Sequence, residues 1–409
     1  MKILLFGAGA SIPFYPSLNT DFITKQIENT EKWIKIIEKY NNYSSNPFNL
    51  KEIICLVNAI CDKKQGLNFE DICGYIDAIA NTLLHPSLYD KENCFGDIIH
   101  TLHNCEILEL KKTPIRNIEY LPYLLRCIII DAVINSVPNS NYNKLIKQQI
   151  EFINYVVKKN EKSSIISLNY DDVLNNTIGS KYNNGFHNQL AKTTPFSVEE
   201  FFRSKHTISY LHGNIRFYNS ILDIHFSKDT IPNSIDRIQG VLGKKTKLCC
   251  FPFVPNNFSY NTFITTGKEK NISLDFLPYN YYYSKFASDI TKSQTIITIG
   301  YSFRDQHVNR ILSPFLKINK KNRIIIIDYY NKDIDCENDE IYDNIIIEIY
   351  KTFFPEEFPT NNDEKNIRQI NTNGYGFLFP QVLFYKKGYE EFLNEYKQVI
   401  NFCNKRIES

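Results

Sequence analysis

Two glycines and a serine stand directly after the first apolar run of the chain. The run KILLF (residues 2–6) leads into the loop Gly7-Ala8-Gly9-Ala10-Ser11. Alternate glycines allow a tight turn and a close approach to the backbone, and exposed backbone N–H groups can hold a phosphate there. A plain turn is the alternative, because a short glycine motif alone is a weak signal. The loop lacks the third glycine and the later acidic strand end of a dehydrogenase, which disfavours hydride transfer.

Two further segments carry side chains suited to positioning or proton transfer. Asn169 and Asp171 lie in NYDD after the apolar run IISL, and His212 lies in YLHGN. Asn169 can orient a ribose hydroxyl or a water, but taken alone a helix cap is the favoured interpretation of these residues. Histidine is the side chain best suited to accept a proton near neutral pH, although a lone histidine is more often structural.

A second pair of apolar runs ends in the same way. Gly300 and Ser302 lie in IGYSF, and Asp328 ends the run RIIII. Ser302 can bind a phosphate and Asp328 an adenosine ribose, but Asp328 can equally cap a turn. Parallel strands present their carboxyl ends at one edge of a sheet, where α/β folds bind ligands. We therefore expect GAGAS, NYDD, LHGN and GYSF to meet at that edge.

The elements that must hold these residues form an interrupted α/β pattern. Strand-length apolar runs precede each polar exit, and residues 305–318 have the spacing of a crossover helix. We predict a Rossmann-like parallel sheet from residues 1–20 and 160–340. Residues 21–159 are predicted as a mainly helical insertion, and residues 341–409 as a C-terminal extension with a role in assembly.

The composition of the 409-residue chain is that of a folded soluble protein, with 43% hydrophobic and 22% charged residues. A net charge of +2 gives no electrostatic case for binding nucleic acid or a membrane surface. No stretch approaches the roughly 20 apolar residues of a membrane span, and the first run is too short for a signal peptide, so a cytoplasmic protein is expected. The ten cysteines form no C-x-x-C pair, so no zinc or other metal is expected.

The order of the motifs resembles the sirtuin-like superfamily over residues 3–330. GAGAS, SLNYDDV, LHGN, TTGKEK, ITIGYSFRDQHV and IIIIDYY follow one another in this chain. NFEDICGYID also resembles a segment of the bacterial antiphage branch, whose members hydrolyse NAD+. The resemblance implies that NAD+ is a substrate, cleaved between nicotinamide and ribose to give nicotinamide and ADP-ribose.

The resemblance also implies roles for individual residues. The GAGAS loop, followed by Pro16 and Ser17, would bind the NAD+ phosphates. Asn169 matches the asparagine near the nicotinamide ribose, and His212 matches the catalytic histidine. The further residues implied at the NAD+ site are Asp171, the later phosphate-side pair Gly300 and Ser302, and Asp328.

Two departures bear on the reaction type. The protein deacylases of the family carry a zinc held by two cysteine pairs and an arginine in a G-I-P-D-F-R stretch. This chain has no such pairs and reads F-Y-P-S-L-N in that place. Both differences weaken a deacylase interpretation and leave NAD+ hydrolysis favoured. The alternatives are a deacylase or ADP-ribosyltransferase that uses the same pocket, and a non-catalytic sensor of NAD+ or ADP-ribose.

The resemblance further implies partners. Family members of this size resemble sirtuin-like subunits encoded beside HerA-type ATPases, which assemble into large rings. A homo-oligomer, a HerA-type ATPase partner and gating of the activity by partner or assembly are therefore expected. A nuclease is disfavoured by the near-neutral charge and by the lack of carboxylates at metal-binding spacing.

Overall fold

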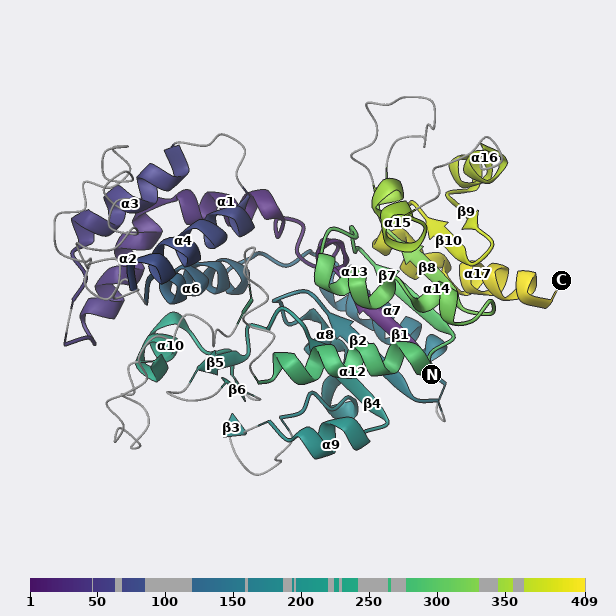
Figure 1. Ribbon diagram of the computed structural model, residues 1–409, viewed down its shortest axis with the longest axis horizontal. Helices are drawn as coiled ribbons and strands as arrows, with labels where there is room; N and C mark the ends of the chain where they lie inside the picture. The colour runs from purple at the N-terminus through teal and green to yellow at the C-terminus, as the bar shows by residue number, and fades with distance from the viewer. Residues whose placement is uncertain are drawn as a thin grey trace, which may run out of the picture.

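The structure is a computed structural model that describes residues 1–45, 47–62, 68–84, 120–158, 161–186, 193–194, 196–219, 224–227, 230–241, 264–265, 277–330, 345–355 and 364–408. In these residues a seven-stranded sheet with covering helices forms one end of the molecule, and a group of helices forms the other (Figure 1). The predicted motif TTGKEK, apart from Thr265, lies outside the described residues.

The sheet of the described chain is mostly parallel. Its strands are β1 (Lys2–Phe6), β2 (Ser163–Ser167), β4 (His206–Tyr210), β7 (Thr295–Ile299), β8 (Arg323–Ile327), β9 (Tyr375–Phe379) and β10 (Val382–Tyr385). They are ordered β4-β2-β1-β7-β8-β10-β9. Neighbouring strands run parallel, except that β9 runs antiparallel to β10. This arrangement confirms the predicted α/β, Rossmann-like fold class.

The register of the strands brings the predicted polar exits together. Phe6, the last residue of β1, is paired with Ser167 at the end of β2 and with Ile299 at the end of β7. Ser167 is in turn paired with Tyr210, and Ile299 with Ile327. Because the parallel strands end in step, the segments that follow them leave the sheet at one edge.

Helices cover both faces of the sheet, which is why β1, β2, β7 and β8 are buried on both sides. One face carries α12 (Tyr279–Lys292), α13 (Gln306–Leu312), α14 (Phe315–Ile318) and α15 (Ile345–Phe353), and the other carries α7 (Tyr142–Val156), α8 (Val173–Ile178) and α17 (Tyr389–Glu408). In Figure 1, α12 and α13 lie in front of the sheet and α7 lies behind it. The helix expected over residues 305–318 is divided at Pro314, which caps the second piece and cannot continue the hydrogen bonding of the first.

The helical end of the molecule is built around one buried helix. Its members are α1 (Thr20–Glu28), α2 (Thr30–Asn41), α3 (Leu50–Asp62), α4 (Phe69–Leu84) and α6 (Leu121–Ile134), to the left in Figure 1. Helix α6 is buried along nearly its whole length and packs against α1, α2 and α4. A helix from much later in the chain, α10 (Ser234–Val241), also packs on α6 and α2.

A buried ion pair lies within this helical group. Arg126 of α6 donates from both terminal nitrogens to the two carboxylate oxygens of Asp77 in α4, each at 2.8 Å. Its Nε donates to the carbonyl oxygen of Ile264 at 3.3 Å. Both partners are buried, so the fork-shaped bond supplies the hydrogen bonds that the two charges lose from water. Asp77 closes the NFEDICGYID segment, which therefore anchors α4 to α6.

The remaining described elements are small. They are a second sheet of β3 (Thr193–Thr194), β6 (Ile224–Ser227) and β5 (Phe217–Asn219), the helix α9 (Val198–Arg203), the helix α16 (Glu364–Asn373) beside β9, and the 3-10 turns η1 (Ala8–Ala10) and η4 (Gly179–Lys181). Among the described helices, none has the length and apolar character needed to cross a membrane.

The C-terminal part of the chain belongs to the sheet, which differs from the expectation of a separate extension from residue 341. Strand β10 pairs in parallel with β8, β9 forms the edge, and α17 packs on α7. Tyr389 of α17 contacts Phe6 of β1 with ring centroids 6.2 Å apart. The sheet therefore extends past residue 340, because β10 covers the edge of β8. The bounds of the insertion and the proposed role in assembly stay predictions.

Candidate active site

A cavity of about 820 Å³ opens at the carboxyl-end edge of the sheet. Its volume is within the range of about 300–1,000 Å³ that is usual for small-molecule sites. Most of the predicted site residues line it: Gly7, Ala8, Gly9, Ser11, Asn169, Asp171, His212, Gly300, Ser302 and Asp328. Ala10 is buried behind the loop, and Pro16 and Ser17 are exposed and do not line this cavity.

The glycine loop is shaped by a contact with a second glycine. Gly300 has a left-handed backbone, with φ +59, and lies against Gly9 and Ala10. A Cβ on Gly300 would lie 2.2 Å from the nitrogen of Ala10, and one on Gly7 would lie 2.5 Å from the oxygen of Gly300. The close backbone approach predicted at this loop is therefore made by the segment after β7, which carries Gly300, to the loop after β1. The amides of Gly7, Gly9, Ala10 and Ser11 already donate to backbone carbonyl oxygens, so a phosphate would have to use other donors.

Asn169 is held by the GAGAS loop. Its Nδ2 donates to the carbonyl oxygen of Gly7 at 2.9 Å and to the Oγ of Ser11 at 2.8 Å. Ser11 donates its own proton to a carboxylate oxygen of Asp171, so its oxygen is left to accept from Asn169. This chain of donors fixes the orientation of the Asn169 amide.

The carbonyl side of the same amide is unsatisfied. The Oδ1 of Asn169 is buried and has no hydrogen-bond partner, although nearly all buried polar atoms in proteins have one. Asn169 lines the cavity, so a ligand hydroxyl or a water there can supply the missing donor. The Asn169 side chain makes no helix-capping bond, because its amide nitrogen is bound to Gly7 and Ser11 and its oxygen has no partner. Its role in binding a ligand stays a prediction. Asp171 does bind the next helix, accepting from the backbone of Val173 at 2.9 Å.

Asp171 is a buried carboxylate whose pKa is raised above its usual value. Burial is the main cause, because it disfavours the charged form, while the hydrogen bond from Ser11 acts in the opposite direction. Asn214, which follows His212 by two positions, donates to the backbone oxygen of Asp171 at 2.8 Å. The NYDD and LHGN segments are thereby fixed to each other.

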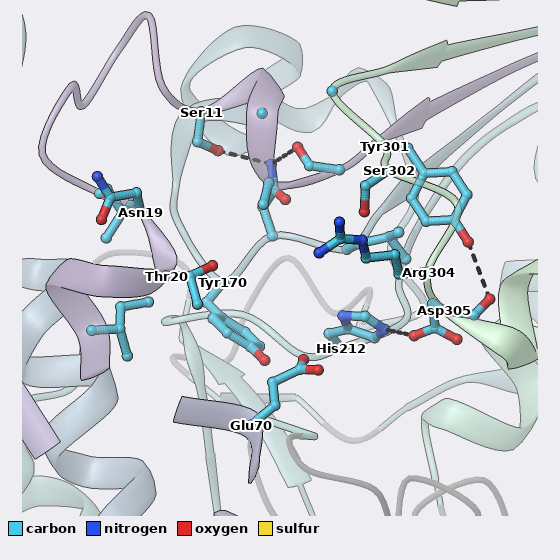
Figure 2. Close-up of a pocket in the computed structure, with 18 of the residues that line it drawn as sticks. Ser11, Asn19, Thr20, Glu70, Tyr170, His212, Tyr301, Ser302, Arg304 and Asp305 are labelled. Atoms are coloured by element: carbon cyan, nitrogen blue, oxygen red, sulfur yellow. Dashed lines mark hydrogen bonds and ion pairs between the residues drawn. The ribbon is translucent and has the colours of Figure 1, made fainter. Parts of the chain in front are cut away.

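His212 is paired with a carboxylate that the sequence did not reveal. Its Nε2 lies 3.0 Å from the Oδ2 of Asp305, and both side chains are buried. The second oxygen of Asp305 caps α13, accepting from the backbone nitrogens of His307 and Val308 at 2.9 and 3.2 Å. Figure 2 shows this pair at the side of the cavity. The sequence places Asp305 at the start of the helix expected over residues 305–318, but nothing in it indicates contact with a histidine 93 residues earlier.

Part of the chain that carries these residues matches a known family model. Residues 163–347 match the family model of the SIR2-like domain. The match supports a place in the sirtuin-like superfamily, and such domains generally act on NAD+. A comparison with curated proteins found no match. Strand β1 and the GAGAS loop lie before the matched residues, yet β1 pairs with two strands within them, β2 and β7.

Arg304 is a further cavity residue that sequence reasoning missed. Among the described residues that line the cavity, it is the one lysine or arginine. Figure 2 shows its guanidinium in the cavity, between Ser302 and His212. Arg304 belongs to the motif ITIGYSFRDQHV. Its positive charge, two residues after the predicted phosphate-binding Ser302, could have identified it from the sequence.

Asp328 lies where the sequence placed it, at the end of β8. Its backbone is held by Tyr385 of β10, whose carbonyl oxygen accepts from its nitrogen at 3.0 Å. Its carboxylate accepts from the nitrogen of Tyr329 at 2.7 Å. Burial raises the pKa of Asp328 to about 6. Asp328 therefore lines the cavity, and one of its carboxylate oxygens binds the backbone of the next residue. Its contact with a ribose stays a prediction.

The helical insertion supplies one wall of the cavity. Asn68, Phe69 and Glu70, at the start of α4, line it opposite the strand ends. Asn68 caps α4, accepting from the nitrogens of Glu70 and Asp71. Figure 2 shows Glu70 and His212 among the side chains that line the cavity. The NFEDICGYID segment thus belongs to the site, which its helical pattern alone did not predict.

The insertion is also joined to the segment that carries His212. Arg126 donates to the carbonyl oxygen of Ile264, and Ile264 pairs with Gly213 in an isolated bridge. The next residue, Thr265, donates its N–H to the carbonyl oxygen of His212 at 2.9 Å. No group of three or more histidine, cysteine, aspartate or glutamate residues in the described ranges is placed to hold a metal ion.

Proposed function

We propose that the chain is an NAD+ hydrolase that cleaves the nicotinamide–ribose bond and releases nicotinamide and ADP-ribose. The observation that carries the proposal is the unpartnered Oδ1 of Asn169 in the same cavity as His212. An oriented acceptor beside a potential base is what the attack of a water or hydroxyl on a ribose carbon requires. The SIR2-like match supports NAD+ as the molecule bound.

The residues of the cavity fit the parts of NAD+. Arg304 offers a positive charge for the diphosphate, and Asp328 offers an acceptor for a ribose hydroxyl. Apolar side chains that suit a flat ring also line the cavity, namely Leu18, Ile23, Phe69 and Val133. The cavity therefore presents charged, polar and apolar groups to the corresponding parts of a dinucleotide.

The chemistry follows from the leaving group. Breaking the glycosidic bond places positive charge on the ribose, as in other glycoside cleavages. Nicotinamide departs as a neutral ring, so no general acid is needed. Asn169 holds the ribose hydroxyl or water through its Oδ1, and His212 accepts the proton as the water oxygen bonds to the ribose. A base in this place contributes about 10²–10⁴-fold in rate.

The biological setting is part of the same proposal and rests on the resemblance of the motifs to the antiphage branch. We infer that the hydrolase depletes NAD+ in infected bacteria and that it is a cytoplasmic homo-oligomer with a HerA-type ATPase as partner. An ungated NAD+ hydrolase would kill its own cell, so partner or assembly gates it. A purified monomer with full activity in the absence of any partner would contradict the gating.

The test is to incubate the purified chain with NAD+ and to follow nicotinamide and ADP-ribose by chromatography. His212→Ala and Asn169→Ala are each expected to abolish the products while the protein stays folded. His206→Ala is the matched control, because His206 begins β4 at the end opposite the cavity. Wild-type turnover in either cavity variant would remove that residue from the mechanism.

The alternative functions predict different results in the same assay. A deacylase or ADP-ribosyltransferase would release nicotinamide only when an acyl-lysine peptide or an acceptor protein is added. A sensor would bind NAD+ or ADP-ribose with no product under any condition, including addition of the ATPase partner. Product from NAD+ and water alone supports the hydrolase.

A further inference from the structure

We propose that Asp305 is a positioning residue that holds His212 in a single tautomer and so decides which ring nitrogen acts as the base. The proposal deepens the proposed function and rests on His212 as the base. It begins from the contact of the His212 Nε2 with the Asp305 Oδ2 at 3.0 Å, which is buried on both sides.

The carboxylate of Asp305 is held in place by contacts other than the one to His212. Its Oδ1 accepts two backbone N–H groups at the start of α13, from His307 and Val308. A carboxylate held by two amides cannot turn freely, so Oδ2 stays directed at the imidazole. An ionised carboxylate only accepts hydrogen bonds, and the proton of a neutral His212 must therefore be on Nε2.

The other nitrogen, Nδ1, is then left with its lone pair. No partner is recorded for it in the described part of the chain, and His212 lines the cavity. Other ionisable groups face this pair: Glu70 of α4 and Arg304 on the cavity side, and Tyr283 of α12 and Tyr301 on the side of Asp305. Burial, with the charge of Asp305 adding to it, raises the pKa of both tyrosines well above the usual value, so they stay neutral and do not replace Asp305 as acceptor.

The loop that carries Asp305 has a strained backbone. Phe303 has φ 57, a left-handed conformation that costs a residue with a side chain about 1–2 kcal/mol. The conformation is held by Asn309, which donates to the carbonyl oxygen of Phe303 at 2.6 Å, and by Tyr301, which donates to the Oδ1 of Asn309 at 2.6 Å. The same hydroxyl lies 3.1 Å from the backbone oxygen of Asp305 and shares its single proton between the two acceptors. Strain kept by its surroundings is typical of functional sites, and here it sets the position of Asp305.

The role in the reaction follows from this arrangement. As a water oxygen bonds to the ribose carbon, the glycosidic C–N bond breaks and its electron pair goes to the nicotinamide ring. The proton of the water passes to Nδ1 of His212, which becomes an imidazolium. Asp305 stabilises that charge through the Nε2 proton without touching the substrate.

Asp305→Asn tests the proposal with little change in shape. Asparagine caps helices as well as aspartate, so α13 keeps its cap. With its oxygen on the α13 amides, the new side chain donates its NH2 to Nε2, which moves the imidazole proton to Nδ1 and removes the base. We expect kcat to fall on the order of 10²–10⁴-fold, with the KM for NAD+ changed less than about threefold. Unchanged kcat would overturn the proposal.

A second variant and a second measurement complete the test. Asp305→Ser retains a helix-capping side chain that is too short to reach His212, and it should lose kcat while its thermal unfolding stays cooperative. The tautomer is read without NAD+ from the ring 15N shifts of labelled histidine, with the His212 signal identified by its loss in His212→Ala. A proton on Nε2 in the wild type and on Nδ1 in Asp305→Asn supports the positioning role even if NAD+ is not cleaved, in which case the proposed function alone fails. The same tautomer in both proteins overturns the positioning role.

Discussion

Ser11 accepts a hydrogen bond from Asn169 at 2.8 Å and donates its own proton to Asp171. The GAGAS loop therefore reaches the reacting part of the cavity through a side chain. If this chain of donors orients Asn169, Ser11→Ala should lower kcat about 10- to 100-fold, because the amide then keeps only its bond to the carbonyl oxygen of Gly7. It should also lower the free energy of unfolding by about 1–3 kcal/mol, because the buried Asp171 loses a partner.

The matched control for Ser11 is another buried serine. Ser209 lies in β4, and its Oγ has no hydrogen-bond partner in the described chain. Ser209→Ala should leave kcat unchanged. The two variants are compared by steady-state assay of nicotinamide release and by urea unfolding, and equal kcat in both would contradict the orienting role of Ser11.

Arg304 should contribute to binding more than to the chemical step. Hydrogen bonds to charged groups contribute about 1.5–3 kcal/mol. Arg304→Ala is therefore expected to raise the KM for NAD+ roughly 10- to 100-fold with a smaller change in kcat. Arg310→Ala, on the exposed side of α13 and away from the cavity, serves as the control. A rise in KM of the same size in both variants would show a general charge effect instead of a contact with the diphosphate.

Gly300 should be among the least replaceable residues of the sheet edge. In Gly300→Ala the new Cβ meets the backbone of Gly9 and Ala10, and the left-handed φ adds its own cost. We expect a loss of about 2–5 kcal/mol in the free energy of unfolding. Gly179 has a similar φ of +54, with ψ −144, and nothing within 4 Å of its Cβ position, so Gly179→Ala should carry only the backbone cost of about 1–3 kcal/mol. Denaturant unfolding separates the two, and equal losses would refute the close contact of the two loops.

Asp328 should make stability fall as the pH rises. Its pKa is raised to about 6 in the folded protein from 3.8, so the folded state binds more protons than the unfolded state between these values. The resulting loss is absent below about pH 4 and complete above about pH 6, where it reaches about 3 kcal/mol. Asp328→Asn removes this loss of stability. The free energy of unfolding of the variant minus that of the wild type, measured with urea, should therefore be larger at pH 8 than at pH 4.5. A difference between the two proteins that does not change with pH would contradict the raised pKa.

The sequence predicted the strand ends well because its signals there are local. KILLF, IISL, ITI and RIIII are runs that are buried on both faces of a sheet, and the polar residues after them fall at one edge by the geometry of parallel strands. Gly7 and Gly9 correctly indicated a close approach to the backbone. That Gly300 is the group that approaches depends on packing between distant segments, which spacing along the chain does not contain.

The contacts that complete the site also depend on packing between segments that are distant in the sequence. Asp305 has the sequence pattern of a helix cap, and its other oxygen meets His212 only in the folded chain. The C-terminal strands had a usable local signal, since YGFLF and VLFY flank the turn at Pro380 and Gln381 in the manner of a hairpin. No local sequence signal indicates that β10 lies beside β8, because parallel strands pair across long stretches of chain.

The central position of β1 has a consequence for the order in which the protein is made. Lys2 reaches its sheet neighbour Thr295 across 293 residues. At roughly 5–20 residues per second, a ribosome needs about 15–60 s to synthesise that length. Throughout that time one edge of the apolar strand β1 has no partner. The nascent chain therefore exposes an aggregation-prone segment, which chaperones have to cover. The cavity forms only after most of the polypeptide has left the exit tunnel, which keeps any NAD+-consuming activity out of unfinished chains.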